Sequence, residues 1–194
     1  MENATHPAGT GIEIPGQGTW ELDPAHTGVG FVARYMGLSK VRGRFTEFSG
    51  RIHVGPTPEE SSVEVTIDPA SVDTSMPMRD THLRTGDFFD VEQFPAITFK
   101  STDVELMGDT SLKVTGDLTI RDVTRPVVLD VEYEGLGLHP TGSTRAAFTA
   151  STEIDRYDFG VSWNAALETG GFLVGRKVRI ELEVLAVAAA TEAA

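Results

Sequence analysis

Residues 111–120 read SLKVTGDLTI, and this stretch decides the fold class. Leu112, Val114, Leu118 and Ile120 alternate with more polar residues, as in a β-strand that buries one face and exposes the other. The same period of two recurs in residues 29–35, 63–67, 97–99, 127–133 and 174–184. Strands with one apolar and one polar face are typical of antiparallel sheets, so the chain is predicted to be all-β.

Turn signals divide this alternation into separate strands. Strands are predicted near residues 19–22, 28–35, 41–54, 62–68, 96–106, 112–120, 127–137, 145–153 and 173–185. Gly108 and Asp109 join two of them as a tight hairpin would. Long antiparallel strands without parallel crossovers can remove their exposed edges by closing into a barrel. Residues 76–84 lack the alternation, and Pro77 near their start and Gly86 beyond their end predict a short helix near one mouth.

Phe45 and Phe48 interrupt the pattern, because residues three apart in a regular strand face opposite sides. A β-bulge near Thr46 and Glu47 would bring both rings to the same face and bend the strand, as barrel closure requires. The alternative is a regular strand that exposes one of the two rings.

Composition excludes several classes of function. With 16 basic and 29 acidic residues the net charge is −13, which disfavours nucleic acid and also docking on an anionic membrane through a basic surface. The chain has no cysteine, so disulfides, thiol nucleophiles and Cys-ligated metals are excluded. No apolar run approaches the ~20 residues of a membrane-spanning helix. The first 17 residues lack the pattern of a signal peptide, so a cytoplasmic location is expected.

Catalytic and metal-binding patterns are not evident. The histidines are scattered without ligand spacing, so no metal site and no cofactor are predicted. Asp80, His82 and Asp87 form the tightest group of histidine and carboxylates, which either caps and solvates the short helix or forms an enzyme site. Residues 155–158 read DRYD and are interpreted as a turn held by an Asp–Arg pair.

The interior of an eight-stranded barrel is just wide enough either to fill with side chains or to hold one slender ligand. Small residues expected on the inner face could leave the lumen open between larger walls: Ala33, Gly43, Gly116, Ala147 and Thr149. Periodicity alone leaves the filled and the hollow barrel equally open. A Phe at position 116 is expected to block a hollow lumen, and to overpack a filled one.

Five ordered motifs resemble the YceI-like polyisoprenoid-binding proteins. They are WELDPAH followed by VGF (residues 20–31), VRGRFTEFSG (41–50), HLRTGDFFD with FPAITF (82–99), VTGDLTIRDVTRPV (114–127) and IDRYDFG (154–160). The resemblance spans residues 18–186, between a flexible arm at 1–17 and a tail at 187–194. It implies a lipocalin-like, eight-stranded antiparallel barrel with a short helix near one mouth.

The resemblance also implies a function, which is non-catalytic binding, carriage or sequestration of a long isoprenoid lipid of the prenyl-quinone or polyprenyl diphosphate type. Burying roughly 600 Å² of a prenyl chain at ~25 cal/mol per Å² would contribute on the order of 15 kcal/mol, against association costs of ~4–15 kcal/mol. The predicted wall residues are Phe31, Tyr35, Phe45, Phe48, Phe99, Leu118, Phe148 and Trp163. Arg34, Arg42 and Arg84 are predicted to bind a polar head group, because guanidinium pairs well with diphosphate.

Two other functions stay open at this point. One is a structural or stress-related barrel with a filled core, and the other is an enzyme with a site near Asp80, His82 and Asp87. The expected partner is an isoprenoid or similar long-chain lipid, without nucleic acid or an integral membrane segment, and a homodimer is compatible with the sequence.

Overall fold

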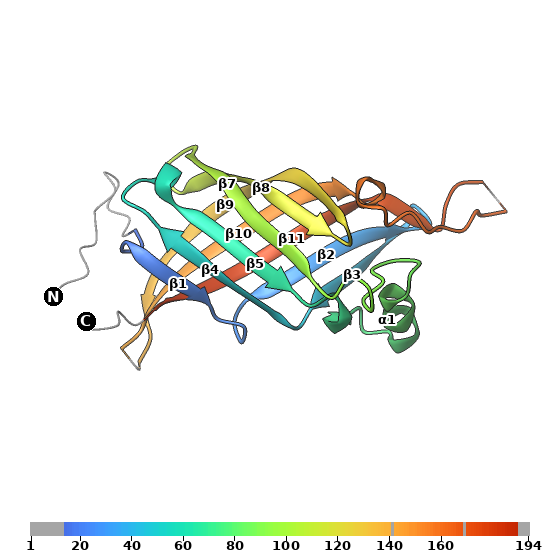
Figure 1. The fold of residues 1–194 in the computed structure, drawn as a ribbon, viewed down its shortest axis with the longest axis horizontal. Coiled ribbons are helices and arrows are strands. Elements are labelled where there is room, and N and C mark those ends of the chain that lie inside the picture. The colour runs from blue at the N-terminus through green and yellow to red at the C-terminus, as the bar shows by residue number, and fades with distance from the viewer. Residues whose placement is uncertain (1–13, 141, 169, 190–194) are drawn as a thin grey trace.

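The structure is a computed structural model that describes residues 14–140, 142–168 and 170–189. The described chain forms one antiparallel sheet that closes into a barrel, with a short helix at one end (Figure 1). The strands are β1 (Gly18–Leu22), β2 (Gly28–Tyr35), β3 (Ser39–Phe45), β4 (Phe48–Val54), β5 (Ser62–Ile67), β6 (Val72–Asp73), β7 (Ile97–Leu106), β8 (Ser111–Ile120), β9 (Val123–Leu138), β10 (Thr144–Asp155) and β11 (Val174–Ala188). The helix is α1 (Pro77–Arg84), and single turns of 3₁₀ helix are η1 (Pro58–Glu60), η2 (Pro69–Ser71) and η3 (Arg156–Phe159).

The barrel has eight strand positions. β1 and β2 follow one another in one of these positions, and β3 and β4 follow one another in the next. β1 and β2 both pair with β11, and on their other side β1 pairs with β4 while β2 pairs with β3. β5, β7, β8, β9 and β10 complete the circuit back to β11 in antiparallel register. The predicted all-β, eight-stranded antiparallel barrel is therefore confirmed.

The strand predicted at residues 41–54 is interrupted where the bulge was expected. β3 ends at Phe45 and β4 begins at Phe48. Phe45 pairs with Val29, and Phe48 pairs with Ile67. Directly paired residues share a face of the sheet, and both partners face the interior. The two rings therefore both face inward, as the bulge interpretation predicts, and the regular-strand alternative is wrong.

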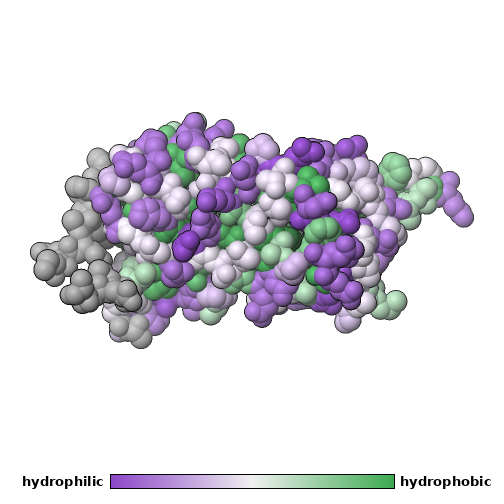
Figure 2. Space-filling view, viewed as in Figure 1, coloured by the Kyte–Doolittle hydropathy of each residue, from purple (hydrophilic) through white to green (hydrophobic). Residues whose placement is uncertain are grey.

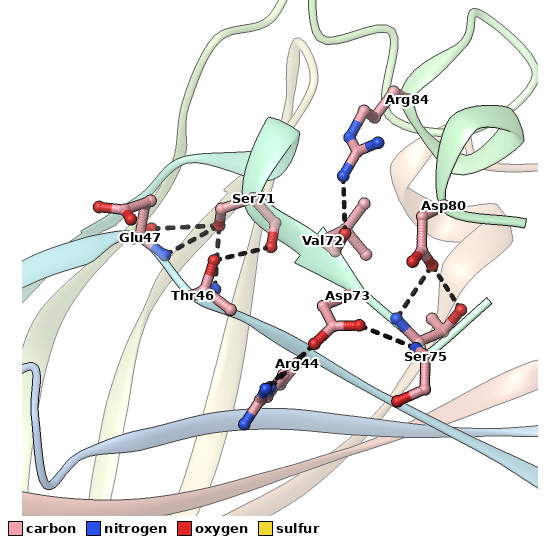
Figure 3. Close-up of polar contacts among 10 residues, drawn as sticks. Arg44, Thr46, Glu47, Ser71, Val72, Asp73, Ser75, Asp80 and Arg84 are labelled. Atoms are coloured by element: carbon pink, nitrogen blue, oxygen red, sulfur yellow. Dashed lines mark hydrogen bonds and ion pairs between the residues drawn. The ribbon is translucent and has the colours of Figure 1, made fainter. Parts of the chain in front are cut away.

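The side chain of Ser71 holds this interruption in place (Figure 3). Its Oγ accepts hydrogen bonds from the backbone N–H groups of Thr46 (3.1 Å) and Glu47 (3.0 Å), and it donates to the carbonyl of Asp68 (2.7 Å). These two N–H groups belong to the residues between β3 and β4, so they have no place in either strand. The side chain thus replaces the sheet hydrogen bonds that the bend removes.

Helix α1 is attached to the barrel through the segment that precedes it. Arg84 donates to the carbonyls of Ala70 (2.6 Å) and Val72 (2.9 Å), and the buried carboxylate of Asp80 accepts from the backbone N–H of Thr74 (2.9 Å). Figure 3 shows Arg84 and Asp80 reaching from the helix toward β6. β6 in turn pairs with β3. The helix is therefore tied to one end of the barrel by side chains that bond to backbone groups.

The predicted boundaries can be compared with the described residues only in part. Most of the predicted N-terminal arm lies outside them, but Gly16 accepts a hydrogen bond from the Trp20 indole N–H (2.9 Å). β11 continues to Ala188, two residues into the predicted tail, where Ala188 pairs with Trp20. Within the described part of the chain, no helix has the length and apolarity needed to cross a membrane.

Candidate ligand-binding cavity

An apolar cavity of ≈ 550 Å³ runs along the inside of the barrel. At the α1 end its lining includes Leu83, Phe88 and Phe89, and at the other end it reaches the loops that contain Pro58 and Asp109. Its side walls are mainly aliphatic and aromatic side chains from the inner faces of the strands. A space of this size lies within the range typical of small-molecule sites. The described barrel is therefore hollow, contrary to the filled-core alternative.

The predicted wall residues divide into two groups. Phe31, Phe45, Phe99, Leu118 and Phe148 line the cavity. Tyr35, Phe48 and Trp163 do not belong to the lining.

Each residue of the second group has a different position. Tyr35 ends β2 and is 41% exposed. Phe48 packs against the core cluster around Trp20. Trp163 packs on His82, with ring centroids 4.7 Å apart, and on Phe88 at 5.3 Å. Alternation places a side chain on the inner face, but it does not decide how far along the barrel the open space extends.

The three arginines predicted at the head group do not line the cavity. Arg34 is exposed near the end of β2, and Arg42 forms an exposed ion pair with Glu181 at 3.3 Å. Arg84 is occupied by the carbonyls of β6 and its neighbourhood, as described above. In the described structure, Arg34 and Arg42 therefore lie on the outer surface, and Arg84 attaches α1 to the barrel.

Arg156, in contrast, lines the cavity. The DRYD stretch that contains it predicts a turn held by an Asp–Arg pair. Arg156 is 5% exposed and donates to the carbonyls of Gly175 (3.0 Å), Val161 (2.7 Å), Trp163 (2.9 Å) and Val174 (3.3 Å). Burial lowers the pKa of its guanidinium below its usual value. The expected pair with a neighbouring Asp is wrong, because this side chain points inward. The apolar residues on either side, Ile154 and Phe159, were the signal for burial.

The Asp of that turn pairs with a different arginine. The Asp155 carboxylate binds Arg176 at 2.8 Å and accepts from the Tyr157 N–H at 3.0 Å. Burial raises the pKa of Asp155, but these hydrogen bonds outweigh the effect of burial and hold the pKa below its usual 3.8. Arg176 interrupts the apolar face of β11 in the sequence, and the pairing of β11 with β2 changes register between Val174 and Val178, on either side of it.

The small residues do not create the cavity in the predicted way. A Cβ added at Gly116 would lie 2.5 Å from the Phe99 ring and 2.6 Å from the Lys100 carbonyl oxygen, so no empty space adjoins it. Thr149 is exposed and donates to Glu134 (2.9 Å). Ala147 alternates with the cavity-lining Phe148 and therefore faces outward. The prediction that Gly116, Ala147 and Thr149 leave open space in the lumen is therefore wrong. Ala33 does line the cavity.

Comparisons with known proteins identify the family. The family model described as YceI-like domain matches residues 20–186. The chain is 38% identical over 138 residues to a UPF0312 protein of Vibrio cholerae, covering 71% of this chain and 73% of that protein. It is 36% identical over 163 residues to a UPF0312 protein of Staphylococcus aureus, with 82% and 92% covered. The chain belongs to the YceI-like family.

Solved structures agree with the YceI-like fold. Burkholderia cenocepacia BcnA matches with a TM-score of 0.75 and 27% identity, over 84% of this chain and 98% of that one. A YceI protein of Campylobacter jejuni matches with a TM-score of 0.68 and 30% identity, over 81% and 90%. A polyisoprenoid binding domain from Saccharophagus degradans matches with a TM-score of 0.68 at 16% identity, over 88% and 98%, which supports the fold alone.

The polar group predicted as an alternative enzyme site does not come together as one cluster in this YceI-like barrel. His82 Nε2 lies 2.7 Å from Asp87 Oδ2, and the His82 ring packs edge-on against Phe88 and Trp163. Asp80 instead binds Thr74 and is buried. Within the described residues, no group of three His, Cys, Asp or Glu side chains could hold a metal ion. The His82 ring of this pair contacts Phe88, which lines the α1 end of the cavity.

Proposed function

We propose that this YceI-like protein binds and carries a long isoprenoid lipid, of the prenyl-quinone or polyprenyl diphosphate type, in the cavity of the barrel. The observation that carries the proposal is the elongated apolar cavity, whose lining extends from Phe88 at the α1 end to the loops at the opposite end. A slender hydrocarbon chain matches its elongated shape and its mainly apolar lining. The Saccharophagus degradans protein described as a polyisoprenoid binding domain has the same fold.

The proposal assigns no catalytic step to the protein. His82 and Asp87 are close enough for proton transfer, but neither belongs to the cavity lining, and the His82 ring packs against Phe88 and Trp163. Arg156 faces the cavity with its donors already directed at carbonyls. A lipid inside would therefore meet mainly apolar atoms. Selection should depend on the length and shape of the chain.

The test is uptake of a prenyl chain by the purified protein, together with a variant that fills the cavity. Organic extraction and native mass spectrometry should first reveal a co-purifying lipid. After the lipid is removed, a long-chain prenyl quinone should bind to the wild type, and Ala150→Phe should abolish this binding because Ala150 lines the cavity.

Thr149→Phe is the matched control, because the neighbouring side chain is exposed on the outer face of the same strand. It should leave uptake unchanged. Equal uptake by the two variants, or a delipidated wild type that takes up no prenyl chain, would refute the proposal. Turnover of a prenyl substrate that is lost in His82→Ala would instead support the enzyme alternative.

A further inference from the structure

The turn between β2 and β3 presents apolar side chains to solvent at the α1 end of the barrel. Leu38 is 80% exposed, Met36 40% and Tyr35 41%. The segment that precedes β11 lies directly beside this turn, because the Met36 N–H donates to the Leu173 carbonyl (2.8 Å), and the adjacent Phe172 is 62% exposed. We call residues 35–39 and Phe172 the hairpin tip. Contiguous exposed apolar residues of this kind mark an interaction surface.

Basic side chains flank the hairpin tip. The stretch from Thr27 to Thr46 contains basic residues but no acidic one, although the whole chain carries a net charge of −13. β11 begins with a second basic run and pairs with β2. The basic side chains on these three strands are Arg34, Lys40, Arg42, Arg44, Arg176, Lys177 and Arg179.

Ion pairs neutralise several of these basic residues, and one of them is Arg176, which lies close to the tip and binds Asp155 at 2.8 Å. Arg42 and Arg179 share Glu181, and Arg44 binds Asp73. Arg34 and Lys40, which pair with each other across the hairpin, form no ion pair with the described residues. One acidic residue, Glu168, lies on the neighbouring loop. The surface next to the apolar tip therefore keeps uncompensated positive charge.

An apolar path connects this tip with the cavity. The inner face of β2 consists of Val29, Phe31 and Ala33, all of which line the cavity, and Tyr35 is the next residue on that face. Val174, the partner of Tyr35 on β11, also lines the cavity. Figure 2 shows that the loop preceding β11 protrudes at the α1 end and carries apolar side chains near the barrel, with hydrophilic ones at its outer end. The tip therefore continues the apolar surface of the lumen to the outside.

We propose that the hairpin tip docks this protein on an anionic lipid bilayer, with Leu38, Met36 and Phe172 entering the interface and Arg34 and Lys40 contacting lipid head groups. Apolar side chains flanked by Lys and Arg are the combination that binds such an interface. The net charge disfavours docking through the surface as a whole, but attraction at this range depends on the charges within about 10 Å of the membrane. The proposal does not depend on which lipid the cavity holds.

Vesicle sedimentation tests the proposal with delipidated protein. Vesicles of phosphatidylcholine containing roughly one third phosphatidylglycerol should bind the wild type more tightly than phosphatidylcholine alone. Arg34→Gln with Lys40→Gln should weaken binding by about five-fold per charge removed, and Leu38→Ser should also weaken it. Leu138→Ser is the matched control, because Leu138 is 77% exposed at the end of β9, outside the hairpin tip. Circular dichroism confirms that each variant folds.

A fluorescent label reports insertion directly, because the natural chain contains no cysteine. An environment-sensitive dye on Leu38→Cys should shift to the blue on anionic vesicles, whereas the same dye on Leu138→Cys should not. Equal binding by all variants, or a shift at both positions, would overturn the proposal. The proposal would also be overturned if Leu38→Ser bound vesicles with unchanged affinity but changed its oligomeric state. The hairpin tip would then be a contact between copies of this chain. Loss of prenyl uptake with intact vesicle binding would count against the proposed function alone.

Discussion

Gly43 and Gly116 each lie under an aromatic ring from the neighbouring strand. A Cβ at Gly43 would lie 2.2 Å from the tip of the Phe31 ring, and one at Gly116 would lie 2.5 Å from the Phe99 ring. Both rings line the cavity. The two glycines therefore let aromatic rings lie flat against the wall, which keeps the rings out of the lumen. Small residues shape the cavity by where they allow large ones to lie.

The two positions should respond differently to the same substitution. Gly116→Ala should lower the free energy of unfolding by about 1–3 kcal/mol, because its methyl group also meets the fixed Lys100 carbonyl oxygen at 2.6 Å. In Gly43→Ala the three atoms nearest to the new methyl group all belong to the Phe31 ring, which can turn into the lumen. This substitution should cost less stability and weaken uptake of a long prenyl chain. Urea denaturation beside a lipid titration would separate the two effects, and equal loss of stability in both variants would contradict this account.

At the scale of elements, the strands could be predicted because their environment is periodic. Each long strand has one face toward solvent and one toward the apolar interior. The alternation in residues 111–120 therefore coincides with β8. Helix α1 could be predicted from Pro77 and the loss of alternation. The hydrogen-bond partners of Arg156 could not be predicted. Its guanidinium donates to four carbonyls from residues 161–175, and no local pattern shows where that segment folds back.

The candidate site was predictable to the same extent. Phe31, Phe45, Phe99, Leu118 and Phe148 follow from alternation and line the cavity. The ends of the cavity depend on contacts between distant segments, such as His82 with Trp163. The head-group role predicted for Arg34, Arg42 and Arg84 rests on the chemistry of guanidinium alone. Arg34 alternates with the cavity-lining Ala33 on β2, so the same periodicity places it on the outer face.

Helix α1 should loosen when its attachment to β6 is removed. Arg84→Ala leaves the Ala70 and Val72 carbonyls without their guanidinium donor, and Val72 is 1% exposed. An unmet hydrogen bond of this kind costs about 1–3 kcal/mol. Hydrogen exchange should accelerate in α1 more than in β8 or β9. Arg51→Ala is the control, because its ion pair with Glu64 is exposed, screened by solvent and should contribute little to stability. Unchanged exchange in α1 would show that the helix is held by other contacts.

At the scale of the whole molecule, closure joins the ends of the chain. β1 pairs with both β4 and β11, so the first and last described strands lie side by side and close the barrel. Asp23 and Arg145 form an ion pair near this seam, and Asp23 also binds His26 (2.9 Å). Burial raises the pKa of Asp23, but these hydrogen bonds hold it below the usual 3.8. A hollow barrel has fewer contacts across its lumen, so it depends more on the continuity of its wall.

That dependence predicts the response of the whole molecule to acid. Hydrogen bonds and ion pairs lower the pKa values of Asp23, Asp155, Glu64, Glu132 and Asp73 in the folded protein. A carboxyl with a depressed folded pKa binds fewer protons in the folded state, so its contribution to stability is complete above its unfolded pKa of about 4 and declines as the pH falls through the folded value. Near neutral pH, these groups should therefore cause no change of the free energy of unfolding with pH. When the pH is lowered below about 4, the free energy of unfolding should decrease.

Asp155 provides the specific test, because it has one arginine partner. Asp155→Asn and Arg176→Met each break the same ion pair, so each should lower stability near neutral pH and make the acid limb shallower. The double variant should lose little more than either single one, because both changes remove the same interaction. Urea unfolding from pH 3 to 7 measures these slopes. A wild type that gains stability on acidification would show that repulsion among its excess acidic residues outweighs the bonds of these carboxylates, and the predicted sign would be wrong.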